Sequence, residues 1–258
     1  MRLLRLAALV LGLSLGTSAC GIYRADASGG GAELSPSGAS VTRPKVAVGF
    51  TATGQTNEAV QSYATLSSAT YGGAALAAGK DQDAAVRRVL FPTIARGQSL
   101  DIVFVVDTTA SMGWAIDSVK AELHQVVATL ASTNPDTRFG LVAFRDRGDS
   151  FVSQIGFSLD KDQRNIHAAI DWLSPDGGGD YPEHVYAGVR QGIRGAGTWR
   201  PNAAHHVVLI GDAPAHDDYQ EPGFTRENII AEARERQVHI DTVAIACAFV
   251  CQKELGIL

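Results

Sequence analysis

The sequence predicts a doubly wound α/β domain, in which helices flank a mostly parallel sheet. Two observations lead to this fold class. From residue 100 to residue 246, short apolar runs of strand length alternate with longer segments whose apolar residues recur at helical spacing. Strands that alternate with helices need crossover connections, which produce a parallel sheet. The first run, residues 100–106, is apolar apart from Asp101, as expected of a strand buried on both faces.

The elements of this domain follow one another in a regular order. The predicted strands are residues 100–106, 138–144, 206–210 and 238–246. The predicted helices are residues 115–130, 166–172, 183–193 and 226–236. The first helix carries an apolar stripe, at positions 116, 119, 123, 126, 127 and 130. Pro182 suits the first turn of the third helix, and Thr225 suits the N-cap of the fourth.

The N-terminal end predicts export from the cytoplasm. Arg2 and Arg5 precede an apolar segment, residues 6–15, of signal-peptide length and too short to cross a bilayer comfortably. The run Thr17-Ser18-Ala19-Cys20 resembles a bacterial lipobox, with Thr17 where that pattern usually has Leu. Lipid on Cys20 would anchor the chain to a membrane on its periplasmic or cell-surface side. Ordinary cleavage after Ala19 is the alternative.

The chain therefore divides into four predicted parts. Residues 1–19 are a signal peptide, and residues 20–43 are a flexible tether rich in Gly and Ser. Residues 44–99 form an N-terminal extension with a short strand at 46–50 and helices at 58–66 and 81–90, which packs on the main domain or leads into it. Residues 100–258 form the α/β domain.

Charge and cysteines exclude some function classes. The net charge of −5 gives no general attraction for nucleic acid, and no basic run with interleaved aromatics is present. An exported chain permits a disulfide between Cys247 and Cys251, and two free thiols are equally compatible with the sequence. Metal binding by this pair is not expected, because no further soft ligand stands nearby.

Side chains that could bind a ligand cluster where the first predicted strand ends. Asp107, Thr109 and Ser111 occupy alternate positions of one tight loop. In open α/β sheets, ligands bind beyond the carboxyl ends of the strands. These hard oxygen donors suit Mg²⁺, Mn²⁺ or Ca²⁺ better than zinc. A capping role for the same side chains, which would satisfy amides of the next helix, is the alternative for this loop taken alone.

The Asp-x-Thr-x-Ser pattern resembles the metal-ion-dependent adhesion site of von Willebrand factor type A domains. Three further segments resemble the same family in the same order. They are Phe139–Asp146, matching an intervening strand, Asp176–Glu183, matching the second metal loop, and Val208–Asp212, matching the third. The resemblance covers roughly residues 100–250 and implies the fold described above.

The resemblance implies a ligand set for one divalent cation. Thr109 and Ser111 would bind through their hydroxyls, Asp107 and Asp212 directly or through water, and Asp180 would take the remaining protein position. Many relatives have Thr where this chain has Asp180. A third carboxylate should strengthen cation binding and weaken attraction for an acidic partner. The family leaves one coordination position open, which a partner's Glu or Asp often fills.

The resemblance thus implies a cation-dependent binding or adhesion module on the cell envelope that engages a protein or a glycan. A structural or assembly protein with a purely structural metal is the alternative. An enzyme is not expected. A Mg²⁺-dependent phosphatase of the haloacid dehalogenase type needs an acid where Thr109 stands. Ser111 lacks the Gly-x-Ser-x-Gly context of a serine hydrolase, and no Lys-Ser/Thr follows the Gly177–Gly179 run, as a P-loop requires.

Several other polar groups carry weaker signals. Arg147-Gly148-Asp149 matches an integrin-recognition tripeptide, a match short enough to arise by chance, and Asp146 and Asp149 are expected to solvate a turn. The segment His216–Asp218 either forms a second metal site or, as the favoured interpretation, a solvated loop. His205 and His206 are expected at the rim or edge of the sheet.

The C-terminal end departs from the family pattern. Its domains usually continue with a helix, a strand and a closing helix after the strand that ends here near Ala246, whereas this sequence stops at Leu258. Either the domain is shortened, which leaves an exposed sheet edge, or the N-terminal extension supplies the missing packing.

Overall fold

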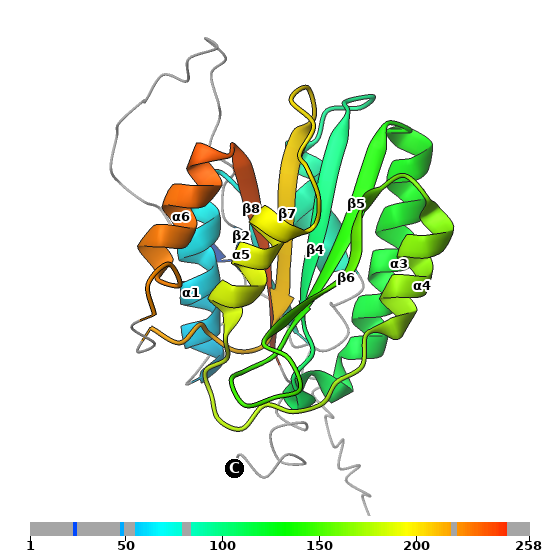
Figure 1. The fold of residues 1–258 in the computed structure, drawn as a ribbon. Helices are drawn as coiled ribbons and strands as arrows, with labels where there is room; N and C mark the ends of the chain where they lie inside the picture. The colour runs from blue at the N-terminus through cyan, green and yellow to red at the C-terminus, as the bar shows by residue number, and fades with distance from the viewer. Residues whose placement is uncertain (1–22, 25–46, 49–54, 79–83, 218–220, 247–258) are drawn as a thin grey trace, which may run out of the picture.

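The computed structural model describes residues 23–24, 47–48, 55–78, 84–217 and 221–246 (Figure 1). Their main feature is a six-stranded sheet of order β3-β8-β7-β4-β5-β6. Its strands are β3 (Ala74–Ala78), β4 (Leu100–Asp107), β5 (Thr137–Phe144), β6 (Ser153–Asp160), β7 (Ala204–Gly211) and β8 (Val238–Ala246). All neighbours are parallel except β5 and β6. The predicted doubly wound, mostly parallel sheet is confirmed.

Helices cover both faces of this sheet (Figure 1). One face packs against α1 (Gln55–Ala69), α5 (Val185–Gly195) and α6 (Arg226–Glu235), and the other against α2 (Ala85–Leu90), α3 (Ile116–Thr133) and α4 (Gln163–Trp172). The central strand β4 serves both layers because successive side chains of a strand point to opposite faces. Ile102 and Phe104 join the core beneath α3, whereas Val103 and Val105 join the core beneath α5.

Two short strands and two 3₁₀ turns are further elements of the described fold. The strands β1 (Tyr23–Arg24) and β2 (Ala47–Val48) pair with each other in antiparallel fashion, and 3₁₀ turns lie at Phe91–Thr93 and Ala110–Trp114. None of the described helices is long and apolar enough to span a membrane. The predicted signal peptide, most of the tether, Cys20, Cys247 and Cys251 lie outside the described residues.

The N-terminal segment supplies the edge of the sheet next to β8. Strand β3 runs parallel to β8, from Ala74 opposite Thr242 to Ala78 opposite Ala246. The backbone N–H of Gly73 donates to the carboxylate Oδ1 of Asp241 at 2.7 Å. Strand β3 therefore extends the sheet beyond β8, and α1 and α2 pack on the two faces beside it. Strand β3 was not predicted, because its sequence is mostly Ala, which is depleted in strands.

Two local predictions were incomplete or wrong. Strand β6 was missed, although Ile155, Phe157 and Leu159 alternate with polar or small residues as an edge strand requires. The helix expected from residue 183 begins at Val185, so Pro182 does not occupy its first turn. The reason is tertiary, since Glu183 pairs with Ala215 in an isolated parallel bridge that holds it in an extended conformation.

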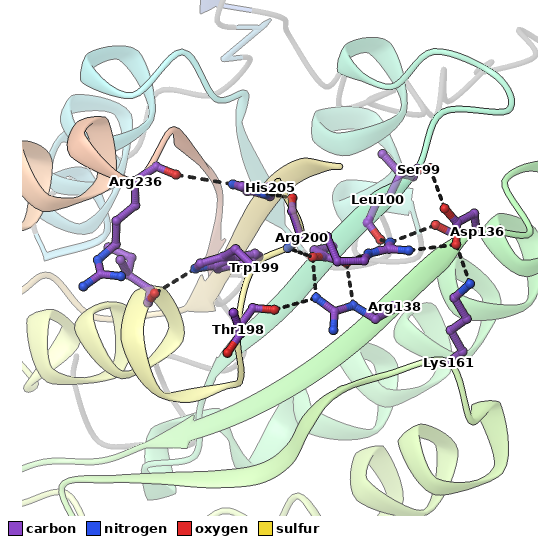
Figure 2. A network of polar contacts seen from close by, with 12 residues as sticks. Ser99, Leu100, Asp136, Arg138, Lys161, Thr198, Trp199, Arg200, His205 and Arg236 are labelled. Atoms are coloured by element: carbon purple, nitrogen blue, oxygen red, sulfur yellow. Dashed lines mark hydrogen bonds and ion pairs between the residues drawn. The ribbon is translucent and has the colours of Figure 1, made fainter. Parts of the chain in front are cut away.

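Arg138 and Arg200 meet at the amino-terminal ends of the central strands (Figure 2). Asp101 is fully buried and accepts hydrogen bonds from Arg138 Nε at 2.8 Å, Arg200 N at 2.8 Å and Arg200 Nε at 2.9 Å. Burial raises the pKa of Asp101, but hydrogen bonds from Arg138 and Arg200 outweigh that effect, so the pKa lies below its ordinary value. The one polar residue of the apolar run is thus a structural anchor.

His205 and His206 were expected at the rim or edge of the sheet; they lie near the start of β7, which is an inner strand and not an edge strand. Both belong to β7, which lies between β8 and β4. His205 contacts backbone carbonyls of Arg200 and Arg236 (Figure 2). His206 is 2% exposed, and its Nδ1 lies 2.7 Å from Asp241 Oδ2. The hydrogen-bond partners make this burial tolerable.

Candidate metal centre

Four of the five predicted metal ligands meet at the carboxyl ends of β4 and β7. Thr109 Oγ1 donates to Asp107 Oδ1 at 2.8 Å and lies 3.1 Å from Ser111 Oγ. Ser111 Oγ donates to Asp212 Oδ1 at 3.0 Å. Two carboxylates and two hydroxyls from two loops therefore form one cluster of hard oxygen donors, which is the donor set that Mg²⁺ or Ca²⁺ prefers.

The alternative interpretation, in which these side chains cap the next helix, is wrong, because neither the 3₁₀ turn Ala110–Trp114 nor α3 has a side-chain cap. The backbone N–H of Thr109 donates to Asp107 Oδ1 at 2.9 Å. The second oxygen of that carboxylate, Asp107 Oδ2, is buried and has no hydrogen-bond partner among the described residues. A capping carboxylate needs only one oxygen, and leaving the other buried without a partner is costly. Asp107 Oδ2 thus fits a bound cation.

Helix α1 reaches the floor of the same site. The hydroxyl of Tyr63 is buried and lacks a hydrogen-bond partner among the described residues. Tyr63 and Asp107 approach the same face of Gly211, where an added Cβ would lie 2.5 Å from the Tyr63 hydroxyl and 3.0 Å from Asp107 Oδ2. Glycine is therefore required at position 211, and the N-terminal segment contributes a polar group beneath the cluster.

Glu183 is a buried acid that the sequence analysis did not single out. Its side chain is 3% exposed, and its Oε2 has no hydrogen-bond partner among the described residues. Burial raises its pKa to about 9, and the charges of Asp107 and Asp146 add to the effect. The signal that could have found it is its place at the end of the second metal loop, directly after Pro182.

Burial raises the pKa values of both carboxylates of the cluster. Burial raises the pKa of Asp107, and the charge of Asp212 adds to this. Burial also raises the pKa of Asp212, although the hydrogen bond from Ser111 opposes it. Metal cations relieve both effects, because they favour the ionised form of a ligand carboxylate.

The fifth predicted ligand, Asp180, lies in a second group of side chains. Its Oδ2 is 3.9 Å from His216 Nε2, and Asp146 Oδ2 is 3.7 Å from the same nitrogen. Asp146 and His216 are 3% and 4% exposed, so the predictions of a solvated turn and a solvated loop for them were wrong. Their burial depends on loops that close over the strand ends, which local sequence does not reveal.

Other candidate groups have structural contacts. Asp149 accepts hydrogen bonds from the backbone N–H of Gly178 at 2.9 Å and of Asp146 at 3.0 Å, so it joins two loops instead of only solvating a turn. Arg147 forms an ion pair with Glu221. Asp217 accepts a hydrogen bond from the Tyr186 hydroxyl at 2.9 Å. Asp218 lies outside the described residues.

A family model described as von Willebrand factor A domain matches residues 101–249. The chain belongs to the von Willebrand factor A (VWA) domain family. Domains of this family mediate protein interactions and often bind a divalent metal, so a protein-interaction module is the coarse function of this VWA protein. The resemblance noted in the sequence is confirmed.

Two curated relatives match about half of this chain. The chain is 26% identical over 131 residues to the alpha-protein kinase vwkA of Dictyostelium discoideum, which covers 50% of this chain and 21% of the kinase. It is 32% identical over 117 residues to the putative ariadne-like RING finger protein R811 of Acanthamoeba polyphaga mimivirus, which covers 45% of this chain and 11% of that protein. The match thus spans a small part of each relative.

Among solved structures, the conserved hypothetical protein BatB from Bacteroides thetaiotaomicron is similar to this VWA protein, with a TM-score of 0.43 and 14% identity. The similarity covers 56% of this chain and 66% of that chain.

The ion-free VWA protein is expected to lose thermal stability between about pH 7 and pH 9. The pKa of Glu183, about 9, lies above that of an unfolded Glu, so the folded chain holds a proton that the unfolded chain has released. The stabilisation that comes from this bound proton is fully present below the pKa of Glu in the unfolded chain. It is lost as the pH rises through about 9, the pKa in the folded chain.

Thermal unfolding in EDTA at both pH values measures the effect. Glu183→Gln should reduce the fall of the unfolding temperature with pH, because the amide does not titrate. The prediction is contradicted if the unfolding temperature of the ion-free protein rises from pH 7 to pH 9. It is also contradicted if the pH dependence of that temperature is the same in Glu183→Gln.

Proposed function

We propose that this chain is a divalent-cation-dependent binding module that engages a protein partner through an ion held by Asp107, Thr109, Ser111 and Asp212. The observation that carries the proposal is Asp107 Oδ2, a fully buried carboxylate oxygen without a hydrogen-bond partner among the described residues, beside the carboxylate of Asp212. Two carboxylates balance the charge of one dication. A glycan is the other class of partner that such an ion can bind.

The oxygen donors favour Mg²⁺, Mn²⁺ or Ca²⁺. Thr109 and Ser111 would contribute their hydroxyls, and Asp212 would bind directly or through water. Glu183 would lie in the outer shell and, if ionised, would add a further negative charge. The participation of Asp180 at this ion stays a prediction.

Replacement of Asp107 by Ala is expected to abolish saturable Mg²⁺ binding in calorimetric titration of the purified protein. We expect affinity to fall by more than about 100-fold, because changes in outer-shell groups alone cost about 10–100-fold. Asp117→Ala is the matched control, since Asp117 is an exposed acid in the first turn of α3. Equal Mg²⁺ affinity in the parent and in a folded Asp107→Ala protein would contradict the proposal.

A purely structural ion is the second candidate, and the burial of the donors favours it. Asp107 and Thr109 are both fully buried, which leaves the ion few exposed protein ligands. A structural ion is bound tightly. Mg²⁺ would then raise the unfolding temperature far more than the same concentration of Mg²⁺ does at a weak site. A small thermal shift in Mg²⁺, together with Mg²⁺-dependent partner binding, would favour the adhesion role.

We also propose binding without catalysis. The loop has Thr109 where a phosphatase of the haloacid dehalogenase type needs a proton donor, and the cluster's two carboxylates flank hydroxyls that suit ion binding. Release of phosphate from p-nitrophenyl phosphate in Mg²⁺, lost in Asp107→Ala, would overturn this part of the proposal.

The cell envelope is the proposed location, with export directed by residues 1–19, lipid on Cys20 and residues 20–43 as a tether. The support is the lipobox-like run of the sequence. Mass spectrometry of the mature N-terminus tests it. A diacylglyceryl modification on Cys20 is expected, and an N-terminus that retains Met1 would rule it out.

A further inference from the structure

A cleft of about 440 Å³ lies along helix α5 and is lined by three arginines. Arg190 and Arg194 belong to α5, and Arg147 belongs to the loop after β5. Glu221 is the one acid among the described residues that line the cleft. The volume lies in the range of sites that hold small molecules. None of the four oxygen donors of the metal cluster lines this cleft, so it is a separate feature of the molecule.

The side chains in and next to the cleft carry an excess of positive charge. Glu221 forms an ion pair with Arg147. Glu232 forms ion pairs with both arginines of α5, and it also pairs with Arg236. Two carboxylates therefore face four guanidinium groups, which leaves two positive charges. Burial lowers the pKa of His184, another lining residue, to about 4, so this histidine adds no charge at pH 7.

Arg190 is held in the cleft by packing. Its guanidinium carbon lies 4.7 Å from the centroid of the Phe224 ring. Gly223 approaches the same group with a φ of +89°, and a Cβ at this position would lie 2.6 Å from Arg190 Nη1. The Nε of Arg190 is buried, has no hydrogen-bond partner among the described residues and lies 3.6 Å from Glu232. Stacking occupies a face of the guanidinium and leaves the N–H donors on its edge to bind an anion.

We infer that this cleft binds a phosphoryl dianion, either as free phosphate or as a phosphomonoester. A guanidinium fork matches two oxygens of a phosphate group, and a dianion balances the two positive charges, whereas a single carboxylate balances one. Ser153 and Gln191 also line the cleft and offer neutral hydrogen-bond donors. The inference does not rest on the proposed function, because no cation takes part in it.

Calorimetric titration of inorganic phosphate and of phenyl phosphate into the full-length protein in EDTA tests the inference. The parent is expected to bind one equivalent of phosphoryl ligand. Arg190→Gln and Arg194→Gln should each weaken this binding about tenfold or more, because each removes charge-assisted hydrogen bonds. The Arg194 side chain is 48% exposed, so Arg194→Gln tests the cleft even where Arg190→Gln impairs folding. Arg164→Gln is the matched control, since Arg164 is 91% exposed on α4 and lies outside the cleft.

The two probes distinguish the sources of the phosphoryl group. Tighter binding of phenyl phosphate identifies an ester as the ligand, and equal or tighter binding of inorganic phosphate identifies the free anion. Changes in the amide chemical shifts of Gln191 and Gly223 are expected with either probe. Affinity that is unchanged in folded Arg190→Gln and Arg194→Gln proteins overturns the inference, as does a folded parent that binds neither probe. An equal loss of affinity in Arg164→Gln and Arg194→Gln also overturns it, because that result indicates general attraction by surface charge.

Discussion

A protein that begins at residue 95, close to the start of the family match, is expected not to fold. It lacks β3, α1 and α2, and so exposes the edge of β8 and both faces beside it. Tyr63, Leu66 and Leu90 are each no more than 1% exposed in the cores that this segment completes. Each contributes about 1.5–3 kcal/mol by burial, and their joint loss approaches the whole stability of a typical domain, about 5–15 kcal/mol.

Soluble yield and cooperative thermal unfolding measure this effect. The control is a protein that begins at residue 44 and retains the N-terminal segment, which should unfold at the temperature of the parent. A cooperative transition at the parental temperature in the protein that begins at residue 95 would show that the segment is dispensable. Leu66→Ala provides a graded version, with an expected loss of about 2–5 kcal/mol from the cavity that it leaves.

Replacement of Asp101 by Ala is expected to destabilise the protein by about 3 kcal/mol or more, because removing one member of a buried ion pair strands the others. Arg138 and Arg200 would lose their shared acceptor at the amino ends of the strands (Figure 2). Their side chains are 19% and 26% exposed, and this partial access to water keeps the expected loss near the lower end of the range. The unfolding temperature should fall by about 6–12 °C.

Chemical denaturation of Asp101→Ala and of the control Asp171→Ala measures the difference. Asp171 is 69% exposed and pairs with His124, so its loss should cost less than about 1 kcal/mol. Equal stability of the two variants would contradict an anchoring role for Asp101. Mg²⁺ affinity should not change in folded Asp101→Ala, because the metal cluster lies at the opposite ends of the strands.

Much of the fold was predictable because its signals are local. Strand β8 has the predicted bounds, and β4 and β5 differ from theirs by one residue at one end. Continuous apolar runs bounded by polar residues specify buried strands directly. The spacing of Asp107, Thr109 and Ser111 likewise places three oxygens on one turn, so this half of the metal cluster followed from the sequence.

The remaining features depend on contacts between distant segments. Ala74–Ala78 becomes a strand only because β8, far away in the sequence, offers an unpaired edge and because α1 and α2 cover it. Tertiary pairing of Glu183 with Ala215 moved the start of a predicted helix by two residues, from 183 to 185, and accompanies the approach of Asp180 to His216.

By itself, then, the sequence determined the α/β pattern and the chemistry of its first metal loop, through periodicity and short spacings. Only the tertiary structure decided which strand closes the sheet and which acids are buried. It also decided how the oxygen and nitrogen donors divide between two clusters. Those outcomes depend on burial and on long-range backbone pairing, which no local window of the chain contains.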